Sequence, residues 1–116
     1  MKLAFDHLVS DLAHPSSEVR AAAAYTLGQY GEQWATVALL HMLTDPDATV
    51  REEAAYALGE LEDVGAVAGL VVACDDADAA VRRTATEALV KLRTHRDPQA
   101  SRLTHSHQDG HTGGPW

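Results

Sequence analysis

The feature that most constrains this chain is an internal repeat, because shifting the sequence by 31 residues superimposes side chains of the same kind. The dipeptide Val19-Arg20 falls on Val50-Arg51 and then on Val81-Arg82. The same register aligns four further sets: Ala4, Ala35 and Ala66; Leu8, Leu39 and Leu70; Ala23, Ala54 and Ala85; and Leu27, Leu58 and Leu89. A unit this short cannot bury an apolar face alone, so the three copies predict one continuous stack.

Apolar residues within each copy recur every three or four positions, which is the spacing of one face of a helix. Val50, Ala54, Leu58 and Leu61 form such a stripe, and strand alternation fits nowhere as well. Breakers and caps separate the stripes in the strings HPSS, DPDA and DDADA. The sequence therefore predicts three helical hairpins, with helices at about 2–13, 17–30, 33–44, 48–61, 64–75 and 79–93.

The segments between helices carry side chains that can cap the helix that follows. Ser16, Asp47 and Asp78 each precede an apolar stripe, where a side-chain oxygen accepts hydrogen bonds from the free N–H groups of the first turn. Cys74 aligns with Leu12 and Leu43, so we expect a small buried hydrophobe there.

Composition narrows the possible functions. Hydrophobic residues make up 46% of the chain but aromatic residues only 5%, which favours alanine-rich, closely packed helices. The formal charge of −8 opposes binding to nucleic acid or to anionic membranes. The single cysteine excludes an internal disulfide and a cysteine-rich zinc site. With no apolar run of membrane-spanning length and no signal-peptide pattern, we expect a soluble, cytoplasmic protein.

The periodic pattern stops near residue 94, where prolines, glycines and serines interrupt it. We therefore expect a repeat domain over residues 1–93, divided at about 1–31, 32–62 and 63–93, and a disordered tail over 94–116. Four histidines lie in this tail, but their spacing is poorly specific, and a solvated segment is expected rather than a metal site: His95, His105, His107 and His111.

The strings HPSSEVRAAAAYTLGQYGE, DPDATVREEAAYALGELED and DDADAAVRRTATEALVKLR resemble HEAT repeats, in particular the short class named for phycobilisome lyases. The resemblance implies an all-α fold, a short right-handed α-solenoid of three helical hairpins. It also implies a ladder between repeats, built from an Asp and an Arg six residues later. The ladder residues here are Asp45 with Arg51 and Asp76 with Arg82, while His14 replaces the first Asp.

Two enzyme families with similar folds can be compared residue by residue. Deoxyhypusine hydroxylases resemble this chain in fold and bind two irons through His-Glu pairs just after the Val-Arg of certain repeats. The equivalent dipeptides here are Ala21-Ala22, Glu52-Glu53 and Arg83-Thr84, and none of them is a His-Glu pair. Helical-repeat DNA glycosylases need a basic concave face, which this chain lacks. We therefore expect no metal, no cofactor and no catalysis.

In a solenoid of hairpins the second helices line the concave face. The register predicts that Ala21 and Ala22 are exposed in the first repeat and Thr84 in the third. The candidate binding residues on this face are Tyr25, Gln29, Glu52, Glu53, Tyr56, Glu60, Arg83, Glu87 and Lys91.

Tyr25 and Tyr56 occupy equivalent positions, so their rings should lie side by side, roughly 10 Å apart at helix-packing distance. Such a pair suits an interface anchor, although the rings would equally pack over alanine gaps beside them. Glu52, Glu53 and Glu60 would attract a basic partner, ligate a divalent cation or form a solvated face.

The sequence is best interpreted as a noncatalytic scaffold that binds another protein or a peptide on its concave face, with a basic partner as one candidate. The alternative is a subunit or relative of a phycobilin lyase. Self-association is also expected, because the ends are poorly supplied with polar caps. The apolar residues behind this expectation are Leu3, Phe5, Leu8, Val9 and Leu12 at one end and Val81, Leu89, Val90 and Leu92 at the other.

Overall fold

A computed structural model of the chain describes residues 2–30 and 33–96, and all regular structure in those ranges is helical. The predicted tail beyond residue 96, with three of its four histidines, lies outside the described residues. In chain order the elements are α1 (Lys2–Asp11), α2 (Ser17–Tyr30), α3 (Gln33–Met42), α4 (Ala48–Leu61), the 3₁₀-helix η1 (Val64–Ala66), α5 (Val67–Ala73) and α6 (Ala79–Arg96). The predicted all-α solenoid of helical hairpins is confirmed.

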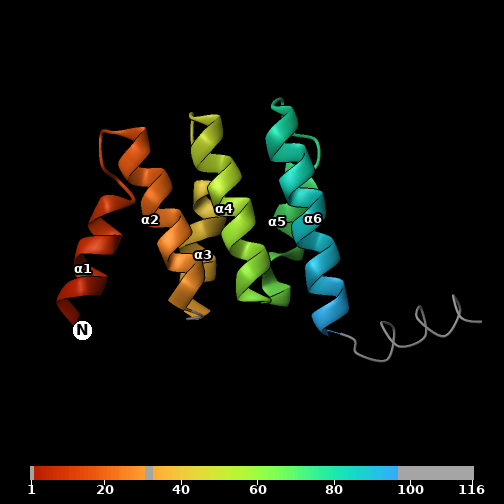
Figure 1. The fold of residues 1–116 in the computed structure, drawn as a ribbon, viewed down its shortest axis with the longest axis horizontal. Coiled ribbons are helices and arrows are strands. Elements are labelled where there is room, and N and C mark those ends of the chain that lie inside the picture. The colour runs from red at the N-terminus through yellow and green to blue at the C-terminus, as the bar shows by residue number, and fades with distance from the viewer. Residues whose placement is uncertain (1, 31–32, 97–116) are drawn as a thin grey trace, which may run out of the picture.

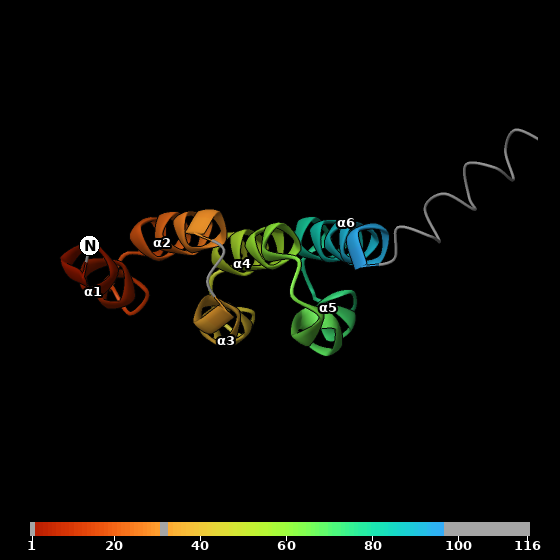
Figure 2. The same cartoon turned by 90° about the horizontal axis from the view of Figure 1, so that it is seen from below.

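The helices form two layers. Helices α2, α4 and α6 lie side by side in one layer, as Figure 1 shows. In the view from below, α3 and α5 form a second layer against them, and α1 lies at the N-terminal end beside α2 (Figure 2). We call the exposed side of α2, α4 and α6, away from α3 and α5, the inner face.

Capping side chains set where the second helices begin. Asp47 Oδ1 accepts from the backbone N–H groups of Thr49 at 2.8 Å and Val50 at 3.2 Å. Asp78 Oδ1 accepts in the same way from the N–H groups of Ala80 at 2.9 Å and Val81 at 3.2 Å. The backbone N–H of Val19 donates to Ser16 Oγ at 3.5 Å. These bonds satisfy N–H groups that have no partner within their own helix.

Small residues hold the inner layer together. A Cβ atom built on Gly28 would lie 2.7 Å from the Cβ of Ala57, and one on Gly59 would lie 2.9 Å from the Cβ of Ala88. Glycine is therefore required where α2 meets α4 and where α4 meets α6. Val90 occupies the equivalent position in α6, where no further helix follows within the described residues, and it is 57% exposed.

The core lies between the two layers. Leu27 and Leu58 are fully buried, and Leu89, at the same position of the third repeat, is half-buried because no later repeat in the described residues covers it. Val81 and Leu92 are buried, although the sequence suggested that nothing would cover them. Their side chains belong to the core cluster that runs through the stack.

Several local predictions need correction. The first helix of the third repeat opens with η1, and its N-cap Asp63 accepts from the N–H of Gly65 at 2.9 Å. Helix α6 runs to Arg96, past the predicted end. Cys74 is half-buried rather than buried. Its counterparts Leu12 and Leu43 are also half-buried, so this register position lies at the rim of the core.

None of the described helices has both the length and the apolar content that crossing a bilayer requires.

Candidate functional site: the ladder and the inner face

The ladder joins each arginine to the next repeat. Arg20 Nε donates to Asp45 Oδ2 at 2.8 Å, and Arg20 Nη2 donates to Asp45 Oδ1 at 3.0 Å. Arg51 binds Asp76 in the same two-pronged way, at 2.9 and 3.1 Å. Within a repeat the contact is different, since Arg51 Nη1 donates to the backbone carbonyl of Asp45 at 2.8 Å. The six-residue spacing between Asp and Arg in the sequence thus corresponds to this backbone contact. The aspartate whose carboxylate binds each arginine lies 25 residues further along the chain.

The carboxylates of the ladder are held in their charged form. Burial alone would raise the pKa of Asp45, but the hydrogen bonds from Arg20 and the Asp47 N–H, with nearby arginine charge, lower it overall. The hydrogen bond from Arg51 is the main reason that the pKa of Asp76 is lowered, against the opposing effect of burial. Each pair therefore stabilises the contact between neighbouring repeats while its carboxylate is charged.

His14 replaces the acceptor in the first repeat. Its Nδ1 accepts from the N–H of Ser16 at 2.9 Å. Asp45 and Asp76 each accept from the N–H two residues further on, also at 2.9 Å. The imidazole thus reproduces the local turn contact of the aspartates without offering a carboxylate.

Tyr25 and Tyr56 lie face to face on the inner face. Their ring centroids are 5.9 Å apart and the ring planes differ by 9°. The expected separation of roughly 10 Å is therefore wrong, because it applies to helix axes. The glycine contact brings α2 and α4 together and lets the rings stack. Both side chains stay well exposed, at 46% and 39%.

A charged pair closes one end of the tyrosine stack. Lys91 donates to Glu60 Oε2, and its Nζ lies 5.2 Å from the centroid of the Tyr56 ring. The hydrogen bond to Glu60 raises the pKa of Lys91. Glu60 therefore has a cation of its own and is not part of an open acidic cluster. Glu60 and Lys91 are 31 positions apart, so they occupy the same position in neighbouring repeats. Opposite charges at that position were the signal in the sequence for this ion pair.

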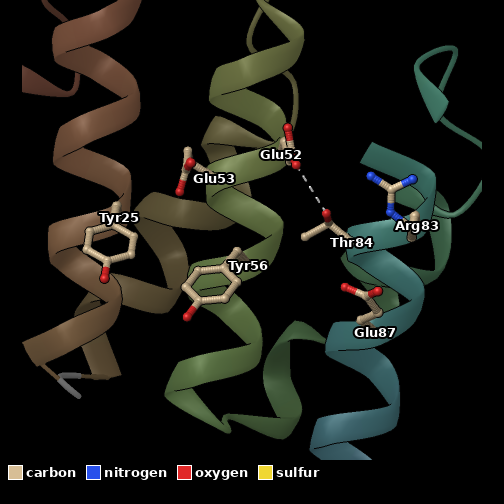
Figure 3. A pocket seen from close by; sticks show the side chains of 7 residues that line it. All are labelled: Tyr25, Glu52, Glu53, Tyr56, Arg83, Thr84 and Glu87. Carbon is tan, nitrogen blue, oxygen red and sulfur yellow. Dashed lines mark hydrogen bonds between the residues drawn. The ribbon is translucent and has the colours of Figure 1, made fainter. Parts of the chain in front are cut away.

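A hollow of about 360 Å³ lies beside the tyrosines, between α2, α4 and α6. Figure 3 shows the seven residues that line it: Tyr25, Glu52, Glu53, Tyr56, Arg83, Thr84 and Glu87. Six of these were candidate residues in the sequence. The structure adds Thr84, which donates to Glu52 Oε2 at 3.5 Å. Gln29 is exposed on α2 but does not line this hollow.

Two predicted exposures are wrong. Ala21 is 7% exposed and Thr84 is 8% exposed, and Thr84 contacts Glu52 of the neighbouring second helix. Ala22 is exposed as expected.

The carboxylates of the hollow differ from those of the ladder. Burial, followed by the charge of Glu52, raises the pKa of Glu53. Neither Glu52 nor Glu53 forms a salt bridge with a Lys or Arg among the described residues. Over residues 2–30 and 33–96, no three His, Cys, Asp or Glu side chains are grouped so as to hold a metal ion. The hollow thus presents three carboxylates and one guanidinium, that of Arg83, beside aromatic rings, so its net charge is negative.

Comparison with solved structures supports the architecture. Human deoxyhypusine hydroxylase, solved with glycerol, is 30% identical over 74% of this chain and 31% of its own, with a TM-score of 0.70. The complex of CpcE and CpcF of phycocyanin lyase from Nostoc sp. PCC7120 is 30% identical over 93% of this chain and 46% of its own, with a TM-score of 0.69. The chain therefore spans less than half the length of either protein.

No curated protein matches the chain. The profile of HEAT repeats matches it twice, over residues 5–90 and over residues 36–110. These matches cover most of the sequence and agree with the hairpin stack and the arginine ladder. The chain belongs to the HEAT-repeat proteins.

Proposed function

We propose that this chain is a noncatalytic, cytoplasmic binding module whose inner face holds a basic segment of another protein or a peptide. The observation that carries the proposal is the hollow itself. Two stacked tyrosines lie beside Glu52 and Glu53, and neither carboxylate has a basic partner among the described residues. Tyrosine is enriched among the residues that anchor protein interfaces.

The chemistry of the hollow favours a cation. Charge on Glu53 is disfavoured by burial and by Glu52, so an arriving Arg or Lys side chain would relieve both costs. The tyrosine rings offer a second attraction, since a cation is stabilised over an aromatic face. Lys91 already occupies such a place over Tyr56. A basic residue of the partner would take the corresponding place nearer Tyr25.

Affinity capture from extracts of the native host tests this proposal. The bait is the wild-type chain, the double variant Tyr25→Ala/Tyr56→Ala, or a control with Val37→Ala and Val72→Ala on the outer layer, where both valines are more than 70% exposed. Wild type and control should capture the same protein, and the tyrosine variant should lose it while keeping its helix content. Equal capture by all three baits contradicts the proposal.

Removal of the two negative charges is expected to show in the salt dependence. Glu52→Gln with Glu53→Gln should weaken binding of the captured protein and reduce its sensitivity to salt, because two partly screened charge contacts are removed. Titrations at low and high ionic strength measure this. A variant that keeps the full salt dependence would show that the partner does not contact these carboxylates.

A second candidate is a subunit or relative of a phycobilin lyase. It is favoured by the similarity to the CpcE and CpcF complex, which extends over 93% of this chain. A chromophore pocket is expected to be apolar or to contain histidine, whereas the hollow on the inner face is lined by tyrosines and charged residues.

Absorption spectroscopy separates the two candidates. A phycobilin mixed with the purified chain should keep the spectrum of the free pigment if the inner face serves protein binding alone. A red-shifted, intensified band that is lost in Tyr25→Ala/Tyr56→Ala would favour the lyase-related role.

A further inference from the structure

The third arginine of the ladder has no carboxylate partner among the described residues. Arg82 Nη1 donates to the backbone carbonyls of Asp76 at 2.8 Å and Ala77 at 3.1 Å. Arg20 Nη1 donates to the equivalent carbonyls of the first repeat, those of His14 and Pro15, at 2.8 and 3.1 Å. Arg51 Nη1 donates to those of Asp45 and Pro46 at 2.8 and 3.2 Å. The three guanidinium groups are therefore held alike.

This shared anchoring fixes the free edge of Arg82. In Arg20 and Arg51 the anchored guanidinium turns Nε and Nη2 toward an aspartate of the next repeat. In Arg82 the same edge lies on α6, the last described helix, at the opposite end of the stack from α1 (Figure 1). A planar guanidinium that is already ordered loses little entropy when it binds a carboxylate in a two-pronged way.

The charge of the chain is strongly segregated around this site. Residues 1–78 contain 3 Lys and Arg against 14 Asp and Glu, whereas residues 79–96 contain 5 against 1. An acidic group is therefore repelled by most of the molecule and attracted to α6. Arg82, Arg83 and Arg93 are all exposed on this helix.

Another repeat in the ladder register does not fit this end. Val90 occupies the position where Gly28 and Gly59 let the next helix approach, so a helix in that register would collide with its side chain. A second copy of the chain fits less well still, because it offers His14 at the acceptor position and itself carries the net charge of −8. The occupant is thus a short acidic segment that reaches Arg82 without packing along α6.

We propose that Arg82 is a preorganised carboxylate-binding site, which takes an aspartate or glutamate side chain from an acidic segment of another protein. The turn that carries Asp45 is the natural reference for such a segment, because it already binds Arg20 in this geometry. The site lies apart from the hollow on the inner face, so it does not depend on what the hollow binds.

The test follows the arginine Nε–Hε signals of the ¹⁵N-labelled full chain by NMR. The probe is the blocked peptide LTDPDATV, the sequence of residues 43–50, and the matched probe is LTNPDATV. The first peptide should shift the Arg82 signal, and the second should bind about tenfold more weakly, because it lacks the charged two-pronged acceptor. Equal shifts with both peptides would overturn the proposal.

Variants separate a specific site from general attraction. Arg82→Gln should abolish the difference between the two peptides, whereas Arg93→Gln, which removes the same charge from an exposed residue of α6, should preserve it. Equal losses in both variants would contradict the proposal. In the free chain, the Arg82 Hε should exchange faster than those of Arg20 and Arg51. Slow exchange would mean that the chain fills the site itself, and a signal that moves with protein concentration would assign it to a second copy.

Discussion

Residue size at one register position decides how closely the inner helices pack. Gly28 and Gly59 each face an alanine of the next helix at a distance that leaves no room for a methyl group. Val90 stands at the same position on α6 and is largely exposed. Position in the stack, and not helix propensity, therefore determines which side chain is tolerated.

Gly59→Ala is accordingly expected to destabilise the chain. The new methyl would lie 2.9 Å from the Cβ and 3.0 Å from the Cα of Ala88, and such overpacking costs about 1–3 kcal/mol, partly offset by the better helix propensity of alanine. Val90→Ala is the matched control and should change the free energy of unfolding by less than about 0.5 kcal/mol. Urea denaturation measures both, and an unchanged midpoint for Gly59→Ala would argue against the close contact.

A buried hydroxyl provides a second prediction at this scale. Thr36 is 4% exposed in α3, and its Oγ1 has no hydrogen-bond partner among the described residues. The equivalent residue of the third repeat is Val67. Because an unpaired buried hydroxyl is costly, Thr36→Val should stabilise the chain by about 1 kcal/mol. Thr49→Val, at an exposed position, is the control, and a destabilised Thr36→Val would indicate a hydrogen bond that the structure does not show.

At the scale of elements, the ladder links the stability of the stack to pH. The pKa of Asp76 is lowered in the folded chain, so its contribution is present above the unfolded-state pKa of about 4 and is lost as pH falls through the folded-state value. Asp76→Asn should therefore lower stability at pH 7 and leave it nearly unchanged at pH 2. Urea denaturation at both pH values tests this, with exposed Asp75→Asn as control. An equal loss at both pH values would show that charge is not the cause.

The elements also show what the sequence could predict. The 31-residue shift and the capping residues placed the hairpins, because both depend on local chemistry repeated three times. The resemblance predicted a ladder between successive repeats, and the structure gives its pairs, Arg20 with Asp45 and Arg51 with Asp76, because spacing along the chain does not show which neighbour a guanidinium faces. The stacking of Tyr25 on Tyr56 and the burial of Thr84 depend on the closeness of adjacent helices, which the two glycines set.

At the scale of the whole molecule, self-association through the ends of the stack stays a prediction. Val81 and Leu92 are buried, but Val9 and Val90 are 50% and 57% exposed, so apolar surface remains near both ends. The net charge of −8 opposes the approach of a second copy, so the association should be weak. Light scattering after size exclusion at about 0.1 mM should give a mass that rises above 12.4 kDa with concentration. A mass that stays near 12.4 kDa would contradict this expectation.

The two proposed sites lie on different parts of one small stack. The hollow between α2, α4 and α6 presents carboxylates and aromatic rings, whereas Arg82 presents a guanidinium edge on α6. A partner with basic and acidic segments would engage both sites at once, and the linkage would strengthen binding without new contacts.

The most direct measurement of the central claim, that the inner face is the binding surface, is an NMR footprint of the captured partner on the ¹⁵N-labelled chain. The account predicts that the largest amide shifts fall around Tyr25, Glu53 and Tyr56, and that α3 and α5 stay unchanged. A footprint confined to the exposed side of α3 and α5, with the amides around the tyrosines unmoved, would contradict it.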